Sequence, residues 1–401
     1  MGHLSRSEIS QSASRSGTFG VQWRLLDSGG TAAIERRRAA GGIREERVNT
    51  QDRGPSIEDV AREAGVSVAT VSRALRGLPN VAAKTRAMVQ QVADDLDYRA
   101  DPSAARLATG KTNLVQIATP TVDGWYFSRF LAGAIDHLLE HGYEVITHPV
   151  EDPAERERLL GDIQGLKKRV DGIILVDLNI SDDVAAELYA EGLRIVTAGF
   201  STRSFPAVTV DDYRVGYIAT EHLLSLGHRR IGIITGEANH PLAFSVPGLR
   251  MAGYTGALGA AGIAVDPLLE ESGHFTAEGA RRAMERLLDL AEPPTAVFVL
   301  SDEMAFGAWG ALNERGMSWP QDMAVIGIDD HELAPMVGLS TIRLTPRRMG
   351  ATAAARLLKS MGANVSNDGA TSSDRTLASR APVDEVSWDW LELVPRSSTT
   401  G

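Results

Sequence analysis

The sequence predicts two folded parts, a small all-α N-terminal domain and a larger α/β core with parallel sheets in two lobes. Residues 56–96 carry apolar side chains at spacings of three and four, which is typical of short amphipathic helices. From residue 114 onward, short apolar runs alternate with helical stretches, and this alternation indicates βαβ units and parallel sheets. The runs are too many for one small sheet, so we expect two lobes.

The expected strands of the core are short runs of Val, Ile, Leu and Ala that end in small or acidic residues. They occupy residues 114–119, 143–148, 172–177, 194–199, 230–236, 295–302 and 323–330. Between them, apolar residues recur with helical period. The clearest of these expected helices occupy residues 128–141, 213–226, 248–261, 276–291 and 303–315. Residues 362–384 are rich in Ser, Asp and Ala, and we expect a loop there.

Charge is unevenly distributed along the chain. Residues 1–55 carry nine arginines against six acidic residues, and residues 56–112 carry eight basic residues against seven acidic ones. The formal net charge of −11 therefore comes from the remainder of the chain, which leaves the N-terminal part free to approach phosphate. Residues 1–55 are rich in Arg, Ser, Gly and Ala without sustained periodicity, so we expect a disordered tail.

Several protein classes are excluded by what the sequence lacks. The chain has no cysteine, which excludes a disulfide framework and a Cys-based zinc site and fits a reducing cytosol. No stretch approaches the roughly 18 apolar residues of a membrane helix, and residues 1–17 have no signal-peptide core. We therefore expect a cytoplasmic protein without a membrane partner.

We also expect no enzyme, no cofactor and no metal. The carboxylates lack a nucleophile–His pair in a recognisable motif, and no His cluster has metal-ligand spacing in the sequence. Residues 110–112 read Gly-Lys-Thr, like the end of a phosphate-binding loop. The first glycine of that motif would fall at position 105, which is Ala, and the segment follows a helical stretch instead of a strand.

Residues 56–75 have the pattern of a helix-turn-helix. Ser56 and Asp59 form a capping box at the start of the first helix. Ala61 is small where two helices cross, Gly65 follows where the chain turns with positive φ, and Val71 is a branched core residue. An ordinary helical hairpin is the alternative, but the caps, the glycine and the core positions agree on the DNA-binding motif. A third helix from about residue 83 completes the domain.

Residues 57–112 resemble the DNA-binding head and hinge of the lactose-repressor (LacI/GalR) family. We expect the head in residues 56–98 and the hinge in residues 99–112. The resemblance implies that the second helix lies in the major groove of double-stranded operator DNA, and that a leucine of the hinge inserts into the minor groove. The residues expected to contact DNA are Ser56, Ser67, Val68, Ala69, Thr70, Ser72, Arg73, Lys84, Thr85, Arg86 and Leu107.

The chemistry of these side chains assigns their roles. Arg73 suits the O6/N7 edge of guanine, whereas Val68 and Ala69 have no hydrogen-bonding group and suit thymine methyls. The hydroxyls and the basic residues of the third helix suit phosphates, with helix capping or solvation as the alternative. Leu107 of the hinge either inserts between base pairs in the minor groove or packs on the core of the protein.

Residues 113–401 resemble the effector core of the same family, which has the fold of periplasmic sugar-binding proteins. The similarity is sharpest in residues 208–236, 250–258, 273–280, 301–316 and 324–335. It implies one lobe of about residues 113–227 plus 344–361 and a second of about residues 228–343 plus 386–395. A small-molecule effector, expected to be a carbohydrate, would bind between them, because ligands of open α/β sheets sit beyond the carboxyl ends of strands.

Polar and aromatic residues at such strand ends are the candidate effector contacts. A carboxylate there accepts hydrogen bonds from neighbouring hydroxyls, and an arginine donates a planar fork. Asp329 and Asp330 also follow an apolar run. Each aromatic residue is either a stacking surface for a sugar ring or part of the core. The residues expected to contact the effector are Arg250, Asp302, Asp211, Phe275, Trp125 and Phe127.

Together these observations predict a DNA-binding transcriptional regulator, a repressor, controlled by the effector between its lobes. The family's helical tetramerisation tail with its leucine heptads is absent from the end of the sequence, so we expect a homodimer. A solute-binding protein and an α/β enzyme are the alternatives, and neither would need residues 56–112.

Overall fold

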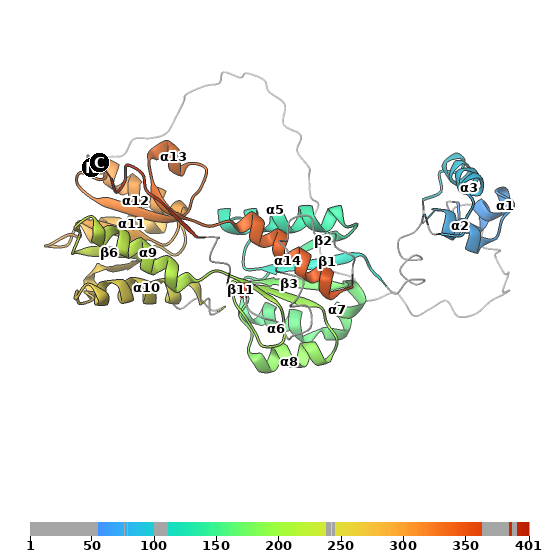
Figure 1. Ribbon diagram of the computed structural model, residues 1–401, viewed down its shortest axis with the longest axis horizontal. Helices are drawn as coiled ribbons and strands as arrows, with labels where there is room; N and C mark the ends of the chain where they lie inside the picture. Colours follow the sequence, from blue (N-terminus) through green and yellow to red (C-terminus); the bar gives the residue numbers. More distant parts are fainter. Residues whose placement is uncertain are drawn as a thin grey trace, which may run out of the picture. The chain divides into compact units, whose positions relative to one another are not determined.

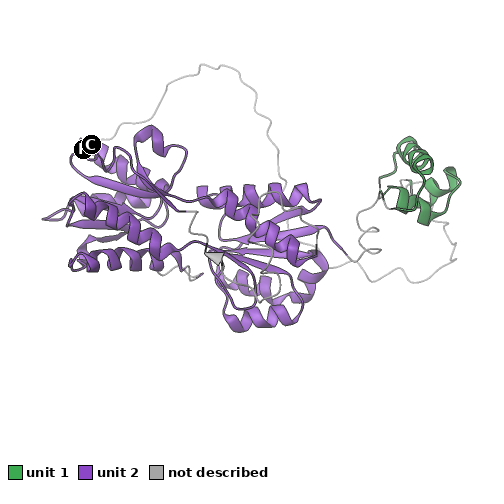
Figure 2. Ribbon diagram, in the orientation of Figure 1, with its two compact units in different colours: residues 1–99 green, residues 100–401 purple. Residues whose placement is uncertain are grey.

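The computed structural model describes residues 55–75, 77, 79–99, 111–237, 242, 245–362, 385–386 and 391–400. The chain forms two units, residues 1–99 and residues 100–401 (Figure 2). Nearly all of the expected tail, most of the expected hinge with Leu107, and nearly all of the expected loop at 362–384 lie outside the described residues.

The first unit contains the expected three-helix head. The Ser56 hydroxyl accepts a hydrogen bond from the Asp59 N–H at 3.3 Å, and the Asp59 carboxylate accepts one from the Ser56 N–H at 3.0 Å, so the capping box is confirmed. Gly65 has φ of 65°, as the turn requires. Val60, Val71 and Val89 are fully buried in a common core. The helices are α1 (Ile57–Glu63), α2 (Val68–Leu75) and α3 (Ala83–Asp95).

The first sheet of the core has the strand order β11-β5-β4-β3-β1-β2, and all its pairings are parallel. The strand β3 is buried along its whole length, which explains why its sequence is a continuous apolar run. The strands are β1 (Leu114–Thr119), β2 (Glu144–Pro149), β3 (Gly172–Val176), β4 (Ile195–Ala198), β5 (Ala207–Thr209) and β11 (Glu385–Val386).

Helices cover both faces of this sheet (Figure 1). One face packs against α5 and α14, and the other against α6, α7 and α8. The helices are α5 (Trp125–Glu140), α6 (Pro153–Gly161), α7 (Ile163–Arg169), α8 (Asp182–Ala190) and α14 (Pro346–Ser360).

The second sheet has the order β12-β10-β9-β8-β6-β7, with β12 antiparallel to β10 and the other pairs parallel. Its strands are β6 (Ile231–Thr235), β7 (Glu270–Ser272), β8 (Ala296–Val299), β9 (Ala324–Asp329), β10 (Ser340–Arg343) and β12 (Glu392–Val394). Its helices are α9 (Asp212–Ser225), α10 (Val246–Ala260), α11 (Ala277–Leu288), α12 (Asp302–Glu314) and α13 (Ala334–Val337), with a 3₁₀ turn at Pro267–Leu269.

Glycines let two helix pairs pack backbone against backbone. A Cβ on Gly133 of α5 would lie 1.9 Å from the carbonyl oxygen of Arg347, which is in the first turn of α14. A Cβ on Gly216 of α9 would lie 2.0 Å from the carbonyl oxygen of Arg250 in α10. No side chain fits at either crossing, and the second crossing fixes the backbone that carries Arg250.

The structure differs from the expected lobe boundaries at α9. We expected the first lobe to extend to about residue 227, but Val215, Ala219 and Leu223 belong to the core of the second sheet. The sequence pattern shows that this helix has an apolar face without showing which sheet that face covers. In contrast, α14 packs on the first sheet, in the segment 344–361 where we expected a return to the first lobe.

The strands β7, β10, β11 and β12 were not expected, because two to four residues are too few to show a period of two. Within the described part of the chain, no helix is both long enough and apolar enough to span a bilayer.

Candidate DNA-binding face and effector cavity

The second helix of the head buries one face and exposes the other. Val71 and Ala74 are buried against the head core, while Val68, Ala69 and Arg73 are exposed. Ala69 and Arg73 are four residues apart, so they lie on the same face of the helix. An exposed valine followed by a small residue and an arginine is a surface that fits base edges and thymine methyls.

Arg73 is available for an external partner. Among the residues that the structure describes, its side chain has no hydrogen bond or ion pair, whereas the neighbouring Arg62 pairs with Asp59. Its guanidinium can therefore make a bidentate contact without breaking an internal bond.

The candidate phosphate contacts differ in how exposed they are and in whether they already make hydrogen bonds within the head. Ser67 accepts from the Thr70 N–H at 3.2 Å, so it caps α2 as expected, and Ser72 is half-buried. Lys84 is exposed in the first turn of α3, where Ala82 offers no side chain to cap the free N–H groups. Such an end attracts phosphate. Thr85 and Arg86 are half-buried beside it, and Leu107 lies outside the described residues.

A cavity of about 480 Å³ lies between the two lobes of the core. Its walls include the positions just beyond β3, β4, β6 and β8 and the last residue of β9, as expected for a ligand site at the carboxyl ends of parallel strands. The lining residues on which the argument depends are Tyr126, Phe127, Asp177, Asp212, Arg250, Phe275, Ser301 and Asp329.

Arg250 is held rigidly in the wall of this cavity. Its Nε donates to Asp212 Oδ1 at 2.8 Å, and its Nη1 donates to the Leu300 carbonyl at 2.8 Å. The side chains of Arg250 and Asp212 are only 9% and 6% exposed, so the ion pair is buried. A guanidinium fixed in this way presents its remaining N–H groups at a defined place.

Several acidic side chains of the cavity have pKa values above the usual range. Burial and the nearby Asp212 carboxylate raise the pKa of Asp177 to about 7. Burial also raises the pKa of Asp329 to about 7, although the charge of Arg250 opposes the shift. The pKa of Asp212 is raised by burial as well, against the same arginine. Asp177 and Asp329 can therefore both donate and accept hydrogen bonds near neutral pH.

Four charged groups of the cavity act on the Tyr126 side chain. The pKa of Tyr126 is well above its usual value because of burial and the charges of Asp177, Asp212 and Asp329, with Arg250 opposing. Asp329 also has φ of 122°, a backbone conformation that side chains other than glycine rarely adopt. Strain of this kind is typical of positions that hold a side chain in a functional site.

Three of the six residues expected to contact the effector line the cavity. Arg250 is buried in its wall, Phe127 comes from the first turn of α5, and Phe275 from the loop after β7. Phe275 has φ of 52° and is 38% exposed, and a Cβ on Gly236 would overlap its ring. The aromatic faces come from both lobes, one on each side of the cavity.

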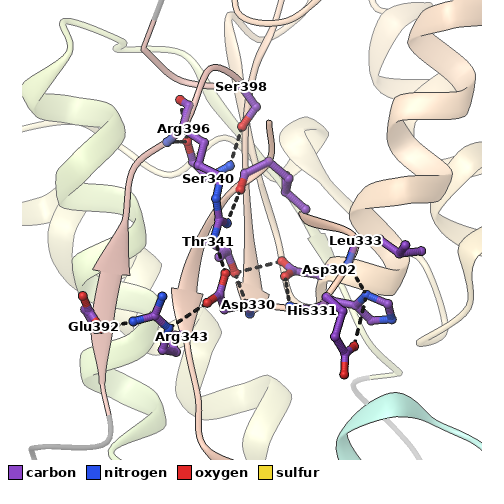
Figure 3. A network of polar contacts seen from close by, with 12 residues as sticks. Asp302, Asp330, His331, Leu333, Ser340, Thr341, Arg343, Glu392, Arg396 and Ser398 are labelled. Atoms are coloured by element: carbon purple, nitrogen blue, oxygen red, sulfur yellow. Dashed lines mark hydrogen bonds and ion pairs between the residues drawn. The ribbon is translucent and has the colours of Figure 1, made fainter. Parts of the chain in front are cut away.

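Asp302 does not line the cavity, contrary to its expected pairing with Arg250. It is fully buried, and its two carboxylate oxygens accept from the Thr341 hydroxyl at 2.8 Å and from the His331 N–H at 2.9 Å (Figure 3). Burial and the charge of Asp329 raise its pKa well above the usual value. Asp302 therefore holds the loop after β9 in place, while its neighbour Ser301 lines the cavity.

Asp211 and Trp125 also lie elsewhere. Asp211 caps α9 by accepting from the Arg214 N–H at 2.8 Å, and the cavity is lined by the next residue, Asp212. Trp125 bridges the lobes outside the cavity. Its N–H donates to Glu303 at 3.2 Å and its Nε1 donates to Glu332 at 2.5 Å.

In the described part of the chain, one cluster of His and Glu side chains has potential metal-ligand atoms close to one another. His137, Glu140 and His141 on α5 have ligand atoms within 4.8 Å of one another. His137 Nε2 is buried without a hydrogen-bond partner. Glu140 is exposed and the spacing is wide, and the absence of a bound metal remains a prediction.

Comparisons with known proteins match both parts of the chain. Residues 56–101 match the family model described as bacterial regulatory proteins, lacI family, and residues 220–387 match that of the periplasmic binding protein-like domain. The HTH-type transcriptional repressor CytR of Escherichia coli strain K12 is 32% identical over 315 residues, which cover 78% of this chain and 91% of that protein.

Two solved structures resemble most of the chain. The lac repressor dimer bound to operator and the anti-inducer ONPF is 26% identical with a TM-score of 0.71, covering 87% of this chain and 100% of that one. The complex of the transcriptional regulator CelR with cellobiose is 27% identical with a TM-score of 0.58, covering 86% and 99%. The chain therefore belongs to the lacI family of bacterial regulatory proteins.

Proposed function

We propose that this chain is a cytoplasmic repressor that binds operator DNA as a homodimer and is controlled by a hydroxylated effector in the cavity between its lobes. As a member of this family it is a transcription regulator and not an enzyme. The observation that carries the proposal is the combination in one chain of an exposed recognition face on α2 with a polar, partly aromatic cavity in the core.

The DNA-binding half of the proposal rests on α2. Its exposed face offers Val68, Ala69 and Arg73 to the major groove, and Lys84 at the start of α3 offers a cation to a flanking phosphate. The structurally similar lac repressor is a dimer bound to operator. A two-fold dimer of this chain would read a near-palindromic site.

The effector half rests on the cavity. Its volume of about 480 Å³ suits a small ligand, the guanidinium of Arg250 can donate to hydroxyls, and Phe127 and Phe275 can stack on the apolar face of a ring. CelR, which has the same fold, binds cellobiose.

Contacts across the lobes provide a route from effector to DNA. Glu332 of the second lobe bonds Trp125 and also pairs with Arg129 of α5. At the other end of the first lobe, Asp171 accepts from the Thr112 N–H at 2.8 Å and from the Asn113 N–H at 2.9 Å. These bonds attach the end of the hinge segment to the first lobe, so we propose that lobe closure moves the hinges of the dimer relative to one another.

The function is tested by a gel-shift assay of the full chain on the DNA upstream of its own gene. We expect a specific complex that competitor DNA of unrelated sequence does not displace. Binding that any duplex displaces equally would refute the operator reading and favour a solute-binding protein.

Arg73→Ala should weaken operator binding by roughly 1–3 kcal/mol and relax the preference at one base pair in each half-site. The variant removes the guanidinium of Arg73 from the exposed face of α2, where it makes no hydrogen bond or ion pair within the described residues and is therefore available to a base. The matched control is Arg62→Ala, which removes an exposed arginine of α1 and should leave the base preference intact. Unchanged specificity in Arg73→Ala would remove this residue from the base-reading face.

A further inference from the structure

The cavity has an excess of buried acidic groups. Asp177, Asp212 and Asp329 are each 9% exposed or less, and they share the cavity wall with one buried cation, Arg250. Among the described lining residues the other basic side chain is His274, which is exposed at the rim. Uncompensated buried charge is costly, so a group that brings positive charge into the cavity would gain more there than in water.

Arg250 cannot compensate all three carboxylates. Its Nε is bonded to Asp212 and its Nη1 to a backbone carbonyl. Asp329 receives a hydrogen bond from the backbone of Asp302 but no ion pair within the described residues. Asp177 lies in the other lobe, directly after β3, and belongs to the same electrostatic cluster.

Asp177 is the decisive side chain. It is 9% exposed and lines the cavity, and no hydrogen bond or ion pair within the described residues occupies its carboxylate. Its oxygens are not among the fully buried side-chain atoms that lack a hydrogen-bond partner, so they face the cavity, where a ligand can reach them. Gly199 provides part of the reason for its orientation, because a Cβ there would lie 1.8 Å from Asp177 Oδ1 and would displace the carboxylate.

We propose that the effector of this chain is a polyhydroxylated amine, such as an amino sugar, whose ammonium group binds to Asp177 in the closed cavity. This inference rests on the proposed function and narrows its ligand class. The ammonium would supply the missing donor to Asp177, with Asp329 on the facing lobe as the second anion, and the hydroxyls would bind to Arg250. A phosphorylated or acidic sugar would instead meet three buried carboxylates.

The test uses pairs of probes that differ only in an ammonium group in place of a hydroxyl. Glucosamine and glucose, galactosamine and galactose, and mannosamine and mannose are each titrated into the full chain by calorimetry and thermal shift, with glucose 6-phosphate as the anionic probe. We expect at least one amine to bind about tenfold more tightly than its hydroxyl partner, because charge-assisted hydrogen bonds are about twice as strong as neutral ones.

Asp177→Asn should reduce this amine-to-hydroxyl ratio to near one, since it keeps the shape and removes the charge. The control, Asp183→Asn, makes the same change at an exposed carboxylate of α8 in the same lobe and should keep the ratio. Operator binding reports that each variant is folded, and Asp329→Asn serves as the second variant if Asp177→Asn does not fold.

The outcomes separate the two proposals. Hydroxyl partners or glucose 6-phosphate that bind as tightly as the amines would overturn the amine inference and leave the proposed function standing. An amine preference that survives in both Asp177→Asn and Asp329→Asn would also overturn it. If no probe of any class binds while operator binding is intact, the inference fails and the effector half of the proposed function loses its support.

Discussion

Arg250→Met should abolish effector binding and lower the free energy of unfolding at neutral pH by about 3–5 kcal/mol, the usual effect of removing one partner from a buried ion pair. Both side chains of the pair with Asp212 are buried, so the variant leaves a buried carboxylate without its cation. The other carboxylates of the cavity lose the same compensating charge.

The pH dependence has a defined sign. Burial already raises the pKa of Asp212, and without Arg250, which opposes the shift, it rises further. A carboxyl group with a raised pKa in the folded state favours folding below its unfolded pKa, and this contribution is lost as pH rises through the folded pKa. The deficit of Arg250→Met should therefore be larger at pH 8 than at pH 5 in urea unfolding.

The double variant Arg250→Met/Asp212→Asn is the control for this prediction. It removes both charges, and replacing both partners of a buried pair is often close to neutral. We expect it to recover most of the lost stability without recovering effector binding. A single variant as stable as the wild type at pH 8 would show that the ion pair does not support the second lobe.

Gly216→Ala should destabilise the core by about 2–3 kcal/mol, as expected for overpacking at a tightly packed site. The added Cβ would lie 2.0 Å from the Arg250 carbonyl oxygen, so α9 and α10 must separate. Backbone cannot rotate away as a side chain can, and the separation also displaces the guanidinium in the cavity. We therefore expect weaker effector binding together with lower stability.

Gly259→Ala on α10 is the matched control, because a Cβ there meets no atom within 4 Å. In an open helical position, alanine is more favourable than glycine by roughly 0.8–1 kcal/mol. The same substitution should thus stabilise at one position and destabilise at the other in thermal unfolding. Equal effects at both positions would contradict the close approach of the two helices.

Local signals in the sequence predicted the head and most strands of the core. The capping box at Ser56 and the turn at Gly65 depend on neighbouring residues only, so they could be read directly and the structure confirms them. The short strands and the lobe to which α9 belongs depend on contacts far along the chain, which periodicity does not record.

The candidate site shows an error of one residue at two junctions. Ser301 and Asp212 line the cavity, and each is the sequence neighbour of a candidate that does not, Asp302 and Asp211 respectively. The strand-to-helix junctions were located correctly. Which of two adjacent side chains points into the cavity depends on the φ and ψ angles of the junction, and the residue types alone do not determine them.

Asp177 was missed although its signal was present. It ends the expected strand at 172–177, and Asp329 lies near the end of the expected strand at 323–330. Both acids lie at the ends of central strands, Asp177 directly after β3 and Asp329 as the last residue of β9. Applying the strand-end argument equally to both lobes would have found it.

The central claim is that a ligand in the cavity controls DNA binding by the head. It is tested most directly by measuring the affinity of the full chain for its operator with and without a ligand that calorimetry shows to bind, in the wild type and in Arg250→Met. The account predicts that the ligand changes operator affinity of the wild type by about 5–150-fold, the usual range of allosteric coupling, and leaves Arg250→Met unchanged. A ligand that saturates the wild-type cavity without changing operator affinity would contradict it.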